Sequence, residues 1–130
     1  MKTLFGAVLA AVVLFTVAGV GAYANDSTTL TGEFIWEGGN TTGDLEAVFT
    51  PNGDGQWNVA FHFEFRGKSH TYSGSASGSL VEGRLEGRVL NESKKRTFTF
   101  EGTFQDGAFS GSHAETHGDK ESSTGTLTLL

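Results

Sequence analysis

Apolar and polar residues alternate along most of the chain beyond residue 25. In the segment WNVAFHFEF, every second residue from Trp57 to Phe65 is apolar, and Asn58, His62 and Glu64 lie between them. Alternation with a period of two is typical of a strand that buries one face. No stretch beyond residue 25 shows the signals of a helix. The pattern therefore predicts an all-β chain.

Clusters of turn-forming residues divide this pattern into strands. The seven clusters read GGNTTG, PNGDG, RGK, VEG, ESKK, DG and GDK. They leave eight expected strands, at approximately residues 29–37, 43–51, 55–66, 69–80, 84–91, 95–104, 108–117 and 121–130. Connections this short join antiparallel neighbours. Closure buries the single apolar face and removes the sheet edges, so we expect an eight-stranded antiparallel up-and-down meander closed into a small β-barrel.

The aromatic residues support a single apolar face. All twelve of them beyond residue 25, nine Phe with Trp36, Trp57 and Tyr72, fall in the apolar phase of their strands. Alternation does not say whether that face is the inside. In an outer-membrane barrel the aromatic residues would meet lipid and the charged residues of the other face would pair in the lumen. The short turns favour the soluble barrel, because membrane barrels usually carry longer extracellular loops.

The first 24 residues have the organisation of a secretory signal peptide. Lys2 precedes an uncharged apolar run, residues 4–20, and AYA follows at residues 22–24. Small residues at these positions indicate cleavage before Asn25. An uncleaved anchor is the alternative, because the run approaches the roughly 20 residues that span a bilayer. We expect a cleaved signal and a single β-barrel domain, residues 25–130, that is secreted or periplasmic.

The net charge restricts the classes of binding partner, and the cysteine content restricts how the fold can be stabilised. Without Lys2 there are eight basic and fifteen acidic residues, a net charge of −7. Such a surface repels nucleic acid and anionic membranes. We interpret the small basic cluster Lys94-Lys95-Arg96 as a solvated turn. Because the chain has no cysteine, an exported domain must be held by its core alone.

Glycines recur in two copies of the pattern Gly-x-Φ-x-x-Gly-x-Φ-x-Gly, where Φ is apolar. The copies begin at Gly78 and Gly102. Folding each copy at its central turn places Gly78 opposite Gly87 and Gly102 opposite Gly111. Glycine inside a strand marks a sharp bend or a place where another group needs the space.

Continuing this register across neighbouring strands gives one inward row. Its members are Gly78, Gly87, Phe100, His113 and Gly125. Either aromatic rings cover the glycines and a neighbour satisfies His113, or the missing side chains leave a pocket for one small ligand. We take this row as the candidate ligand-binding site.

Polar residues of the inward phase extend the candidate site. They are His70, Tyr72, His113, Glu115 and His117, of which we add Tyr72 and Glu115 to the binding set. The run HAETH, which ends at His117, places its two histidines and its glutamate on one side of a strand, about 6.6 Å apart per step. Zinc accepts such ligands, but no fourth ligand is identifiable, so we predict neither a metal nor a cofactor. No spacing singles out a nucleophile, base and acid, so we do not expect an enzyme.

The function predicted from the sequence is non-catalytic binding of a small apolar or aromatic ligand inside the barrel. The first alternative is a structural or partner-binding module of the cell envelope with a filled barrel. The second is the small outer-membrane barrel.

Overall fold

The computed structural model describes residues 26–91 and 93–130, which form eight antiparallel strands. They are β1 (Thr28–Trp36), β2 (Thr41–Pro51), β3 (Gln56–Phe65), β4 (Lys68–Gly78), β5 (Gly83–Asn91), β6 (Arg96–Gln105), β7 (Ala108–His117) and β8 (Lys120–Leu129). One turn of 3-10 helix, η3 (Glu37–Gly39), joins β1 to β2. Each strand pairs with the next, and β8 pairs with β1, so the barrel is closed. The predicted all-β meander and its closure are confirmed.

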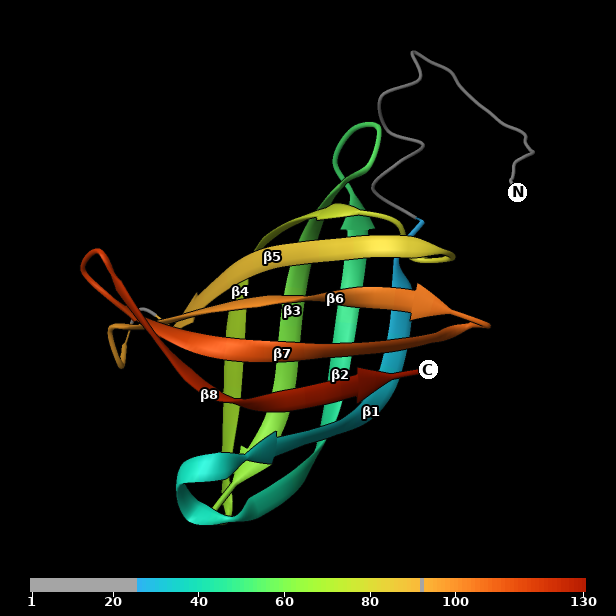
Figure 1. Cartoon of the computed structure of the whole chain (residues 1–130). Coiled ribbons are helices and arrows are strands. Elements are labelled where there is room, and N and C mark those ends of the chain that lie inside the picture. Colours follow the sequence, from blue (N-terminus) through green and yellow to red (C-terminus); the bar gives the residue numbers. More distant parts are fainter. Residues whose placement is uncertain (1–25, 92) are drawn as a thin grey trace.

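The barrel is strongly twisted. In Figure 1, β2, β3 and β4 run together along the back, and β5 to β8 cross in front of them at a steep angle. The strand β1 bends between the two groups and pairs with both β2 and β8. This crossing gives the barrel two ends. The mouth end carries η3 and the turns after β3, β5 and β7, and the closed end carries the turns after β2, β4 and β6.

The apolar face of the sheet is the inside. The buried core contains Phe34, Phe49, Phe61, Tyr72, Phe100, Phe104 and Phe109 among its aromatic members. Along β4, the outward residues between the buried Tyr72 and Ala76 are serines. The arrangement required by an outer-membrane barrel, with aromatic residues outward, is therefore wrong for this chain.

The N-terminal signal prediction concerns residues 1–24, which lie outside the described residues. Among the residues that the structure describes, no helix is long and apolar enough to cross a membrane.

Most of the predicted register is confirmed. Gly102 lies opposite Gly111, Phe100 opposite both Gly87 and His113, and His113 opposite Gly125. The predicted pairing of Gly78 with Gly87 is wrong, because Gly78 pairs with Leu85 and Ala76 pairs with Gly87.

The error at Gly78 comes from the turn between β4 and β5. The Ser79 hydroxyl oxygen accepts hydrogen bonds from the backbone N–H groups of Val81 and Glu82, at 3.0 and 3.1 Å. The Ser79 N–H bonds to the Arg84 carbonyl oxygen at 3.0 Å. These bonds move the centre of the turn toward β4, and Ala76 takes the place in the inward row that we had given to Gly78.

Candidate functional site

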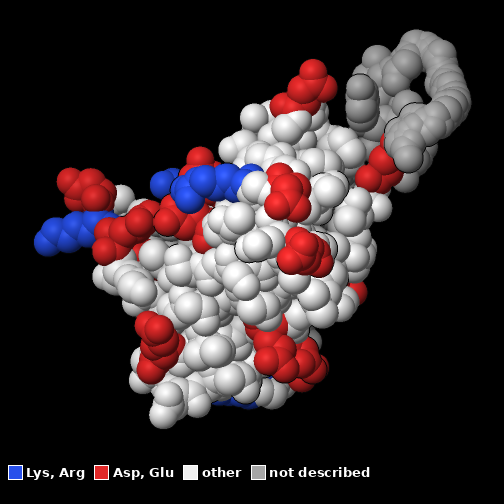
Figure 2. Space-filling model, turned by 45° about the vertical axis from the view of Figure 1, so that its right-hand side comes forward, with Lys and Arg blue, Asp and Glu red and all other residues white. Residues whose placement is uncertain are grey.

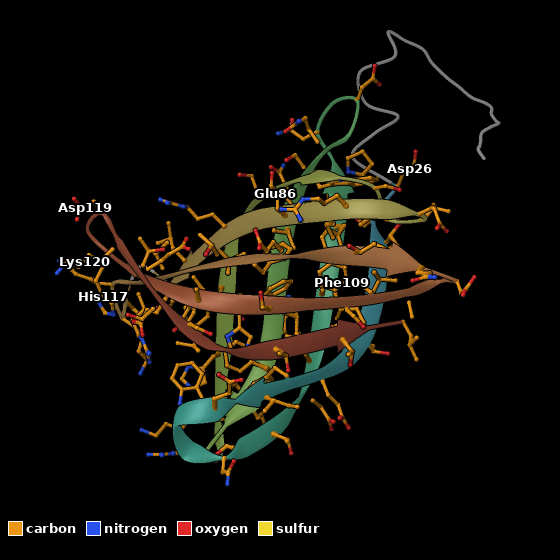
Figure 3. All side chains as sticks on the ribbon, in the orientation of Figure 1. Asp26, Glu86, Phe109, His117, Asp119 and Lys120 are labelled. Atoms are coloured by element: carbon orange, nitrogen blue, oxygen red, sulfur yellow. The ribbon has the colours of Figure 1, made fainter. Side chains whose placement is uncertain are left out.

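The two ends of the barrel are packed differently. The largest fully buried side chains are Phe49, Leu85, Phe104, Phe109 and Leu129, all of which belong to the closed end. Figure 3 labels Phe109 near that end and His117, Asp119 and Lys120 at the mouth. Full packing leaves no space at the closed end for a ligand, so any interior site must lie toward the mouth.

A cavity of about 110 Å³ lies inside the barrel at its mouth end. Its lining is largely aromatic. The lining residues are Phe34, Trp36, Leu45, Phe61, Phe63, Phe65, His70, Tyr72, Val89, Arg96, Phe98, Thr99, Phe100, His113 and Leu127. Trp36, Phe63, Phe65 and Phe98 are only half-buried, so the aromatic lining continues to the surface of the mouth.

Aromatic rings hold one another in place around this cavity. Trp36 and Phe98 meet edge to face with ring centroids 5.9 Å apart, and Tyr72 meets Phe98 in the same way at 5.5 Å. The ring of Phe63 stacks on Tyr72 at 5.7 Å. Such pairs add about 0.5–1.5 kcal/mol each beyond their buried area. The cavity walls are therefore fixed by packing in the absence of a ligand.

His113 forms part of the wall through a distortion of β8. His113 pairs with Gly125 and Ala114 pairs with Ser123, which leaves Thr124 as a bulged residue without a partner. The Thr124 hydroxyl lies 2.6 Å from Nδ1 of His113, and Nε2 lies 3.1 Å from the carbonyl oxygen of Ile35. A carbonyl oxygen only accepts, so Nε2 carries a proton. The Thr124 hydroxyl, which also donates to the His113 carbonyl oxygen at 3.1 Å, is the hydrogen-bond partner of Nδ1.

The surroundings of His113 favour its neutral form. Its ring stacks on Trp36, with centroids 6.1 Å apart. Burial lowers the pKa of His113 below its ordinary value of 6.5, and the bond to Ile35 and the charge of Glu37 oppose this only in part. Both ring nitrogens are engaged, so His113 is a positioned wall residue.

Arg96 closes part of the mouth. Its guanidinium lies 5.2 Å from the ring centroid of Phe98 and 5.6 Å from that of Trp36. Nε and Nη2 each donate to one carboxylate oxygen of Glu115 at 2.8 Å. These hydrogen bonds lower the pKa of Glu115, although burial opposes the shift, and they raise that of Arg96.

Tyr72 is the other polar group deep in the lining. Its side chain is only 4% exposed, and burial raises the pKa of its hydroxyl above the ordinary value of 10.0. The Arg96 charge opposes that shift and the Glu115 charge adds to it. Tyr72 is therefore neutral at physiological pH and offers a hydroxyl to the site.

The predicted binding residues divide between the cavity and its surroundings. Tyr72, Phe100 and His113 line the cavity, but Glu115 does not and lies behind Arg96. None of the glycines predicted for the site is a lining residue, and Gly78 lies in a different row.

The expected space beside the glycines is already filled. A Cβ at Gly87 would lie 2.7 Å from Cζ of Phe100, and one at Gly125 would lie 2.9 Å from two atoms of the His113 ring. It would also meet the Ile35 carbonyl oxygen at 1.8 Å. The glycines make room for these two rings, so the hypothesis that their missing side chains form a pocket is wrong. The cavity lies beyond the rings, toward Trp36 and Phe98.

Arg96 lines the cavity but was not among the site residues predicted from the sequence. The interpretation of Arg96 as part of a solvated turn is wrong, because Arg96 is the first residue of β6 and its side chain, 41% exposed, pairs with Glu115 and lies over two lining rings. The missed signal was the alternation itself. Arg96, Phe98 and Phe100 share one phase, and that phase places Arg96 inward.

The HAETH segment does not assemble a metal site in the described residues. His117 is 65% exposed and lies 3.7 Å from Glu115, while both nitrogens of His113 are engaged elsewhere. No group of three His, Cys, Asp or Glu side chains in the described part of the chain is placed to hold a metal ion.

A second hollow of about 430 Å³ lies on the outer surface across β4 to β7. Its outward side chains are polar. They are Gln56, Ser75, Ser77, Glu86, Arg88, Thr99, Glu101, Ser112 and Glu121, together with the small Ala114. Arg84 bridges Glu86 and Glu101 at 3.4 and 3.2 Å, with more than half of each side chain exposed, and Figure 3 shows Glu86 on the outside of β5. Ala76 borders this hollow together with Gly87, Phe100 and His113 of the predicted row. Exposed ion pairs contribute little, and the polar side chains around the hollow differ from the mostly apolar lining of a small-molecule site.

No protein-family model and no curated protein matches the sequence. The site geometry therefore carries the functional argument.

Proposed function

We propose that the barrel binds one small apolar or aromatic ligand in the cavity at its mouth. One observation carries the proposal: the cavity is lined by aromatic side chains that pack on one another and continue to the surface. Small-molecule sites are typically concave and apolar, with a few polar groups that orient the ligand. Tyr72 and Arg96 are suited to that orienting role.

The size of the cavity restricts the ligand. An engineered apolar cavity of about 150 Å³ binds benzene. The barrel cavity, at about 110 Å³, is somewhat smaller but open at the mouth. The ligand is therefore one ring or a short aliphatic group, with any larger part projecting past Trp36 and Arg96.

We propose that binding is not coupled to catalysis. Glu115 is engaged by Arg96, and His113 uses both ring nitrogens within the wall. A general base needs a free acceptor within reach of its substrate. We also propose that the domain acts outside the cytoplasm, on the basis of the N-terminal apolar run and AYA.

A structural or partner-binding module remains the second candidate. The completely buried side chains of the closed end favour it, because that half of the barrel has no room for a ligand. The two candidates differ in whether the mouth cavity takes up a molecule from solution.

The two tryptophans provide the test. Trp36 lines the cavity, whereas Trp57 donates to the Gly78 carbonyl oxygen at 3.1 Å and packs on Phe49 near the closed end. A Trp57→Phe variant reports Trp36 alone, and a Trp36→Phe variant reports Trp57 alone. Titrated with toluene, the first should show a saturable fluorescence change and the second a much smaller one. A folded Trp57→Phe protein with no saturable response would contradict ligand binding and favour the second candidate.

A further inference from the structure

The cavity contains one permanently charged group. Among the described residues that line it, Arg96 alone is ionised at any working pH, because an arginine is not deprotonated in proteins. Its partner Glu115 is not a lining residue, and only 13% of the Glu115 side chain is exposed. The ionic group presented to a ligand is therefore a cation.

Arg96 retains hydrogen-bonding capacity in this position. A guanidinium has five N–H groups, and Glu115 engages two of them. The guanidinium also lies over the rings of Phe98 and Trp36, and the two hydrogen bonds to Glu115 set its orientation. Glu115 thus acts as a positioning residue, and the remaining donors are held at the rim of the aromatic cavity. Rigid donors lose less entropy on binding than mobile ones.

The distribution of charge also favours the mouth as the place for an anion. Six of the eight basic residues beyond residue 25 lie in or beside the mouth-end turns: Arg66, Lys68, Lys94, Lys95, Arg96 and Lys120. The mouth-end turns also carry Glu37 and Asp119, whereas the turns of the closed end carry Asp54, Glu82 and Asp106 and no basic residue. Figure 2 shows acidic side chains over much of one face, with Lys and Arg in only a few places. An anion is repelled by the barrel body and least disfavoured at the mouth.

We infer that the ligand is a small apolar or aromatic acid, whose ring occupies the cavity and whose carboxylate binds Arg96. This inference rests on the proposed function and adds the chemical class of the ligand. Charge-assisted hydrogen bonds from arginine to a carboxylate are shorter and stronger than neutral ones. Arg96 is the residue that determines specificity.

Three single-ring probes test the inference: benzoate, neutral benzamide and cationic benzylamine. Their affinities for the mature protein are measured by ligand-observed NMR at pH 7.5 and low salt. We expect benzoate to bind about tenfold more tightly than benzamide, as one hydrogen bond to a charged group would give, and benzylamine to bind most weakly. The preference for benzoate should shrink with added salt.

Matched arginine variants separate a direct contact from general charge. Arg66 lies over Phe65 at 5.2 Å near the mouth but does not line the cavity. Arg96→Gln should abolish the preference for benzoate and leave benzamide within about twofold, whereas Arg66→Gln should keep most of the preference. Arg96→Lys, which retains the charge, should restore part of it. Circular dichroism and thermal unfolding establish that each variant is folded.

The outcomes distinguish this inference from the proposed function. If benzamide binds and benzoate does so no better, the acid specificity is wrong and the ligand site stands. Equal losses in Arg66→Gln and Arg96→Gln would also overturn the role of Arg96, because only net charge would matter. If Arg96→Gln does not fold, the preference of the wild-type protein for benzoate at low and high salt still tests the acid specificity, and Arg96→Lys tests the residue responsible. If none of the three probes binds, the proposed function fails and the inference falls with it.

Discussion

Positions 87 and 125 are occupied by glycine because an aromatic ring lies against each of them and leaves no room for a side chain. Phe100 covers Gly87, and His113 lies against Gly125, where the backbone φ of 153° is also one that other residues rarely adopt. A sequence shows that an inward row contains glycines but not what covers them, because a ring from a neighbouring strand and an empty space leave the same pattern.

The first residue-scale prediction concerns Gly87. Replacing it with alanine brings a methyl group within 2.6 Å of the Ser75 carbonyl oxygen and 2.7 Å of Phe100. Overpacking of this kind typically costs about 1–3 kcal/mol, so Gly87→Ala should lower the free energy of unfolding by that amount in a urea titration. Gly38→Ala is the control, because its methyl group would lie 3.4 Å from the nearest atom, on Trp36, and should change stability by less than about 0.5 kcal/mol. Equal stability of the two variants would show that the space beside Gly87 is empty.

The second residue-scale prediction follows from the lowered pKa of His113. The folded protein resists protonation of this ring, whereas the unfolded chain takes up a proton near the ordinary pKa of 6.5. The unfolded state binds more protons between the two pKa values, so stability should fall as the pH drops from 7 toward the folded pKa. His113→Gln should lose this part of the pH dependence, and His117→Gln, at an exposed position, should retain it. Urea midpoints at several pH values measure the effect, and an unchanged slope in His113→Gln would contradict it.

Strand order and most of the pairing followed from the sequence because each turn is short and each strand alternates clearly. The miss at Gly78 arose in the turn VEG, where Ser79 binds two backbone N–H groups and moves the centre of the turn. The bulge at Thr124 was likewise hidden, because an extra residue in one strand leaves no mark in the alternation of either neighbour. The inward position of Arg96 could have been predicted from its phase in the strand. A charged side chain next to two lysines instead indicated a solvent-exposed turn.

The element-scale prediction concerns the seam where the barrel closes. β1 and β8 pair over Gly32–Trp36 and Gly125–Leu129, with further bonds between Thr31 and Leu130, and no turn joins the two strands. The β3–β4 hairpin, in contrast, pairs from Gln56 to Phe65 and is closed by a tight turn. The parts of a fold that are held by the fewest contacts open most often. The backbone amides of the β1–β8 seam should therefore exchange with deuterium faster than those of the β3–β4 hairpin. Equal protection at both places would contradict this order.

The whole molecule combines a packed closed end with an aromatic mouth. Phe104 and Phe109 lie against each other at 5.4 Å in the closed half, while half-buried rings and Arg96 surround the cavity in the other half. The packed half stabilises the barrel without a disulfide bond. The mouth half therefore does not need to be fully packed and can contain a cavity. A ring entering there would displace little but water.

The processing prediction belongs to the full chain. If the apolar run and AYA form a signal peptide, the exported protein should begin at Asn25. The intact mass of the secreted or periplasmic species measures this directly. A product that retains Met1 would support a membrane anchor instead.

The most direct measurement of the central claim is a crystal structure of the mature protein soaked with iodobenzene. Iodine scatters anomalously, so its position is identified by a peak in the anomalous difference map. We predict an iodine peak within or at the opening of the mouth cavity, between Trp36, Tyr72 and Phe98, with the closed end unchanged. A soaked crystal with no iodine in the barrel, and with the mouth rings closed over the space, would contradict it.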